Sequence, residues 1–182
     1  MRADSSPGHC FAVLGRWLAL GALVLLPSLS NANGQPAITA DKLLKTGQLL
    51  IEKTHYLEAL DLLEEAKDLL TVSGKDQTAM CADVLFSLAQ AKIKARLHQD
   101  FPAYYVKTAL QEIQAANKLR DKLGNVLPQK LAEGYYLEGY IQKKFFMRKN
   151  AARLCFKKAT AIDPGSAPAK RELYELEAEN KK

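Results

Sequence analysis

Few residues in this chain have the types and spacing that chemistry requires. The three histidines, His9, His55 and His98, lie far apart among polar neighbours, and the three cysteines form no Cys-x-x-Cys pair. The spacings typical of zinc and of redox-active cysteine pairs are therefore missing. No HExxH, no GxSxG and no glycine-rich phosphate loop occurs. We expect no enzyme activity, no metal and no cofactor.

The carboxylates with helical spacing are the next candidates. Asp61, Glu64, Glu65 and Asp68 fall on one polar face of a predicted helix. Carboxylates at such spacing usually solvate a surface. They therefore predict a charged, solvated face and not an acid–base site.

An N-terminal leader precedes every other predicted element. Arg2 and Arg16 come before an uncharged apolar run, WLALGALVLLPSL, which small residues follow at Ser30 and Ala32. This order predicts a secretory signal peptide over residues 1–32, cleaved after Ala32. The run has 13 residues, whereas a spanning helix needs about 20. An uncleaved membrane anchor extending back through residues 11–15 is the alternative, and Arg16 in its middle makes it costly.

Export changes the meaning of the charge and of the thiols. The leader holds two Arg and one Asp, so 24 basic and 19 acidic residues remain, a net charge of +5. A basic surface in the periplasm meets lipid, polysaccharide or acidic proteins, and no nucleic-acid partner is expected. Membrane contact is expected only through the uncleaved leader. An exported setting permits a Cys81–Cys155 disulfide, whereas thiols on apolar helix faces are more often core residues.

Charge also divides the chain into blocks. Residues 33–91 carry a net charge of −4, residues 92–160 carry +10, and residues 161–182 carry −1. A charged block of this kind is usually a solvated face. It also suits an acidic partner or a second copy of the chain.

Apolar residues recur at helical spacing from Asp41 onward. Two stripes are separated at residues 53–55, and Thr54 is expected to cap the second helix. Helices joined by so short a link must pack antiparallel. Small residues at Gly47 and Ala59 would let the two axes approach closely.

This order of small and apolar residues occurs three times. A small residue opens each unit at Gly47, Ala89 and Gly139. An Ala–apolar–Ala triplet with spacings of four and three then follows: Ala59, Leu63, Ala66; Ala109, Ile113, Ala116; Ala152, Phe156, Ala159. The third unit ends in Asp163-Pro164. The pattern resembles the tetratricopeptide repeat, a 34-residue helix–turn–helix unit.

The resemblance implies an all-α fold, a right-handed solenoid of antiparallel helix pairs. Three irregular repeats are expected at about residues 39–72, 78–121 and 128–164, followed by a C-terminal capping helix at 165–180. The step from the opening small residue to the triplet is 12 residues in the first unit, 20 in the second and 13 in the third. The second unit therefore carries an eight-residue insertion, expected as a loop that contains His98.

In this family the first helix of each repeat lines a concave groove. The inward positions imply the following contact residues: Leu44, Gln48, Ile51, Phe86, Gln90, Ile93, Tyr136, Tyr140 and Lys143. Members that clamp a C-terminal carboxylate place Asn where this chain has Gln48, Gln90 and Tyr140, so that specificity is not expected. The implied function is a protein–protein interaction module or scaffold of a bacterial-type cell envelope, binding a peptide or helix segment. The alternative is a structural protein that self-associates through its acidic first and basic later repeats.

Overall fold

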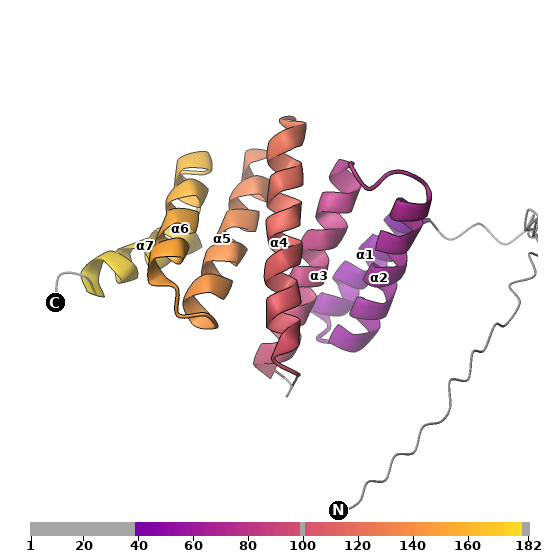
Figure 1. The fold of residues 1–182 in the computed structure, drawn as a ribbon, viewed down its shortest axis with the longest axis horizontal. Coiled ribbons are helices and arrows are strands. Elements are labelled where there is room, and N and C mark those ends of the chain that lie inside the picture. Colours follow the sequence, from indigo (N-terminus) through magenta and orange to yellow (C-terminus); the bar gives the residue numbers. More distant parts are fainter. Residues whose placement is uncertain (1–38, 99–100, 180–182) are drawn as a thin grey trace, which may run out of the picture. The chain divides into compact units, whose positions relative to one another are not determined.

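The computed structural model describes residues 39–98 and 101–179. The predicted signal peptide, its cleavage point and the alternative anchor lie outside these residues. Over the described ranges the protein is all-α, with seven helices and no strand (Figure 1). They are α1 (Ala40–Glu52), α2 (Tyr56–Val72), α3 (Ala79–His98), α4 (Tyr104–Leu123), α5 (Pro128–Lys144), α6 (Lys149–Ile162) and α7 (Ala167–Glu179).

Consecutive helices pack against each other along the chain. α1 packs on α2, α3 on α4 and α5 on α6, and these pairs are joined by contacts of α2 with α3 and of α4 with α5. The first helices of the pairs also touch, α1 with α3 and α3 with α5, and α7 packs on α6. This packing of successive helix pairs is compatible with a helical repeat. None of the described helices is long and apolar enough to cross a membrane.

Small residues allow the two helices of a pair to approach closely. A Cβ atom added to Gly47 would lie 2.8 Å from Leu63 Cγ, and one added to Gly139 would lie 2.6 Å from Phe156 Cε1. All nine triplet residues are fully buried. The recurring order in the sequence therefore corresponds to the core positions of the three pairs.

The expected cap at Thr54 is wrong. Thr54 has a φ of +65°, and the N–H groups of Thr54 and His55 donate to the carbonyls of Ile51 and Leu50. This pair of backbone hydrogen bonds is typical of a helix that ends at a residue in the left-handed conformation. Thr54 therefore terminates α1, and α2 begins only after His55, whose side chain makes no cap hydrogen bond.

Most of the eight extra residues of the second unit lengthen its helices. α3 and α4 have 20 residues each, against 13 and 17 in α1 and α2. His98, expected in a loop, is the last residue of α3, and its ring stacks on Tyr56 at 6.0 Å between centroids.

Candidate functional site

The nine predicted groove residues lie on α1, α3 and α5 and divide into two groups. Leu44, Ile51 and Ile93 are buried among core side chains, so they have no surface to offer a partner. The other six are exposed or half-buried. We call these six the exposed strip: Gln48, Phe86, Gln90, Tyr136, Tyr140 and Lys143.

Several side chains of the exposed strip are held by neighbours. Gln48 Nε2 donates to Ser87 Oγ at 3.1 Å, which links α1 to α3. The guanidinium of Arg120 lies 4.9 Å from the Phe86 ring centroid. The rings of Tyr136 and Tyr140 lie 6.4 Å apart. These contacts limit the motion of the strip residues before any partner arrives.

Lys143 connects the exposed strip to the last helix. Its Nζ lies 2.7 Å from Glu172 Oε2 and 2.8 Å from Glu175 Oε2, both on α7. Burial disfavours the ammonium, but the hydrogen bonds and charges of the two glutamates outweigh it and raise the pKa of Lys143. The hydrogen bond from Lys143 lowers the pKa of Glu175. An acidic helix thus already lies against one end of the strip.

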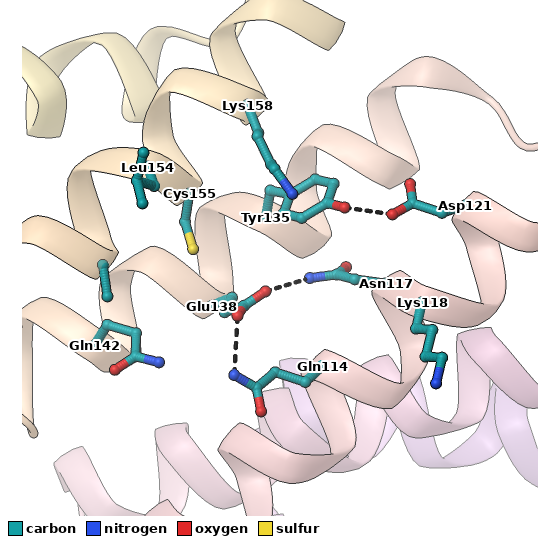
Figure 2. A pocket seen from close by; sticks show the side chains of 11 residues that line it. Gln114, Asn117, Lys118, Asp121, Tyr135, Glu138, Gln142, Leu154, Cys155 and Lys158 are labelled. Atoms are coloured by element: carbon teal, nitrogen blue, oxygen red, sulfur yellow. Dashed lines mark hydrogen bonds between the residues drawn. The ribbon is translucent and has the colours of Figure 1, made fainter.

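A second candidate is a pocket of about 520 Å³ between α4, α5 and α6 (Figure 2). Residues of α4 and α6 form its walls, and residues of α5 form its floor. We call it the α5 pocket. Its lining comprises Gln114, Asn117, Lys118, Asp121, Tyr135, Glu138, Gln142, Ala151, Leu154, Cys155 and Lys158.

The Glu138 carboxylate is held in the α5 pocket by side-chain amides. Gln114 Nε2 donates to Oε1 at 3.0 Å, and Asn117 Nδ2 donates to Oε2 at 2.9 Å. Glu138 forms no ion pair with any described residue, although Lys118 and Lys158 line the same pocket. Two amides from α4 therefore orient this carboxylate of α5.

Tyr135 closes one end of the pocket. Its hydroxyl donates to Asp121, and Lys158 Nζ lies 4.8 Å from its ring centroid. Burial, followed by the hydrogen bond to Asp121, raises the pKa of Tyr135. The hydroxyl is a fixed donor and does not ionise near neutral pH.

The two described thiols are free, and Cys81 and Cys155 form no disulfide. Burial, and then the charge of Glu138, raise the pKa of Cys155 to about 12. Burial also raises the pKa of Cys81. A nucleophilic cysteine needs a lowered pKa, so neither thiol suits that chemistry.

Sequence reasoning assigned none of the residues that line this pocket to a site, Gln142 included. The side chain of Gln142 is 6% exposed, its Oε1 has no hydrogen-bond partner, and no described residue bonds its Nε2. Buried amides are normally paired. The available signal was a polar residue three positions after Gly139, where the preceding unit has Lys92 and the first has Leu50.

No group of three or more His, Cys, Asp or Glu side chains in the described ranges could hold a metal ion. Comparison with known proteins does not assign the chain to a family. No protein-family model and no curated protein sequence matches the chain.

Proposed function

We propose that the protein is an exported, non-catalytic protein–protein interaction module with a tetratricopeptide-type right-handed solenoid. Its three irregular repeats would span about residues 39–72, 78–121 and 128–164, with the C-terminal helix as a cap. Three observations support this proposal: the recurring buried triplets, the packing of successive helix pairs, and the row of first helices that carries the exposed strip.

The contact of α7 with the exposed strip carries the proposal. Lys143 binds two glutamates of α7, while Leu173 and Leu176 pack with Tyr136 and Phe156. A helix with acidic and apolar residues therefore already occupies one end of the strip. A partner segment of the same amphipathic kind would continue along α5 toward α3, with the tyrosines as anchors.

Affinity capture from a cell-envelope extract tests this function. The immobilised wild-type protein and a Tyr104→Ala control should retain the same partner, since Tyr104 is an exposed tyrosine on α4 and the strip is carried by α1, α3 and α5. A Tyr136→Ala/Tyr140→Ala variant should lose that partner. Retention by the double variant, with an unchanged helical circular dichroism spectrum, would exclude the strip as the binding site.

We also propose that the predicted signal peptide directs export of the protein to the periplasm. Mass analysis of the exported protein should give a mature N-terminus at Asn33. An intact Met1 on membrane-bound protein would favour the anchor instead.

Self-association is a second candidate, favoured by the distribution of unpaired charge. Nine basic residues between 92 and 160 form no ion pair with any described residue, and α2 exposes Asp61, Glu65 and Asp68. Complementary patches on two copies would attract each other in low salt. Sedimentation velocity should then show oligomers that dissociate as salt rises, whereas a monomer at low salt would exclude this function.

A further inference from the structure

The α5 pocket has a counterpart one helix pair earlier in the chain. The steps from Ala59 to Ala109 and from Ala89 to Gly139 are both 50 residues, and the step from Ala109 to Ala152 is 43. These offsets relate two sets of three positions. The first junction comprises Glu64 of α2, Lys92 of α3 and Glu112 of α4, and the second junction comprises Gln114 of α4, Gln142 of α5 and Cys155 of α6.

The first junction is held together by charge. Lys92 is 7% exposed, and its Nζ lies 3.3 Å from Glu64 Oε1 and also bonds Glu112. The ammonium therefore connects α2 to α4 across α3. Leu88, one turn before Lys92, is fully buried and completes an apolar floor.

The second junction has the same backbone plan without that connection. No side-chain hydrogen bond joins Gln114, Gln142 and Cys155, and the side chain of Gln142 has no partner among the described residues. Glu138 occupies the position of Leu88, and Figure 2 shows it bound to the two α4 amides while Gln142 stands apart. The result is an open pocket whose floor contains an unused amide 6% exposed to solvent.

The lining of the α5 pocket favours a neutral ligand. Lys118 and Lys158 offset Asp121 and Glu138, so the lining carries no formal net charge. The net charge of +10 over residues 92–160 disfavours a cation, and Glu138 on the floor disfavours an anion. A free amide offers one acceptor and two donors, which complement the N–H and C=O of a peptide group.

We propose that the α5 pocket binds the backbone of an extended peptide segment from a partner protein, with the Gln142 amide paired to a peptide group. The α4 wall from Gln114 to Asp121 is about 10 Å long at 1.5 Å per residue, which accommodates about three extended residues. Leu154, 65% exposed at the rim, provides an apolar contact for one side chain. The site is separate from the exposed strip and does not depend on it.

Nuclear magnetic resonance on the ¹⁵N-labelled protein tests this site with three probes. N-acetyl-Ala-Leu-Ala-amide should shift the side-chain amide signals of Gln114 and Asn117, saturating in the millimolar range. Agmatine and acetate, a cation and an anion, should leave these signals in place. Shifts with either ion alone, shifts confined to Gln48 and Gln90, or no shift at all would overturn the proposal.

Two variants of Gln142 and one control locate the effect. Gln142→Met removes the amide and Gln142→Lys reproduces the residue of the first junction, and both should abolish the tripeptide shifts. Gln90→Met, an amide change on the exposed strip, should preserve them. If the Gln142 variants lose signal dispersion, Leu154→Asp at the exposed rim should weaken binding at least several-fold. Undiminished shifts in a folded Gln142 variant or in Leu154→Asp would overturn the site, while partner capture through the strip would be unaffected.

Discussion

The first and second junctions have the same arrangement of three helices, but side chains connect the outer helices at the first and leave a pocket at the second. At the first junction, the Lys92 ammonium bonds carboxylates from both neighbouring helices, and only Oε2 of Glu112 is left without a partner there. At the second, the equivalent Gln142 makes no side-chain hydrogen bond to the described residues of α4 or α6, and a pocket remains. The difference arises from four side chains, the three junction residues and Glu138 in the place of Leu88, because the small residues recur at corresponding positions. A stabilising contact and a binding site are thus alternative uses of one location between helix pairs.

Removing the central polar group, Lys92 at the first junction and Gln142 at the second, should give the largest difference in stability between the two junctions. Lys92→Met leaves Glu112 buried without its cation and should lower the free energy of unfolding by roughly 3 kcal/mol. Gln142→Met removes an amide that has no partner and should change it little or raise it. Urea denaturation of both variants measures the contrast. Equal losses of unfolding free energy in the two variants would mean that Lys92 and Gln142 contribute equally to stability.

Larger side chains at the helix crossings test the feature that both junctions share, the buried small residues. Ala59→Leu and Ala152→Leu insert three carbon atoms into fully buried positions and should each cost about 1–3 kcal/mol. Lys157→Leu, on an exposed position of α6, is the control and should change stability by less than about 0.5 kcal/mol. Tolerance of Leu at both alanines would show that the repeat register is wrong.

Alkaline pH should lower the stability of the fold through the thiol of Cys155 at the second junction. The folded pKa of Cys155 is raised to about 12, and the pKa of Tyr135 is raised as well. Both groups are neutral in the folded state while the unfolded chain loses the thiol proton from about pH 9 upward. Stability is therefore fully present below pH 9 and falls as pH rises toward 12.

Urea midpoints measured at intervals from pH 8 to 11 should show this fall. Cys155→Val should remove part of it, because the thiol no longer titrates. An identical slope in the variant would assign the alkaline loss to other groups, such as the thiol of Cys81 in the first helix pairs.

The smallest effect is expected where the exposed strip meets α7. Glu175→Gln removes the solvent-exposed ion pair with Lys143 and leaves the Lys143–Glu172 pair in place, so the free energy of unfolding should change little. The change should be local, with faster hydrogen exchange in α7 and unchanged exchange in α1 to α4. Lys144→Met, which removes an exposed lysine with no ion pair among the described residues, serves as the control.

The sequence by itself determined the helices and their crossings. Helix formation follows from side-chain periodicity, and Gly47, Ala59 and Ala152 identified crossings because only small residues permit so close an approach. The same local reasoning failed at Thr54, because this residue could either cap the second helix or terminate the first. A threonine before a helix suits a cap, but the end of α1 required a left-handed residue at that position.

Only the tertiary structure decided which polar and apolar residues were available for contact. Leu44, Ile51 and Ile93 lie on the predicted inward face, yet side chains from neighbouring helices cover them. Gln142 reads as an ordinary polar helix residue until α4 and α6 are placed on either side of it. Whether a buried amide finds a partner depends on side chains about 13 to 28 positions away along the chain, and periodicity within one helix contains no information about them.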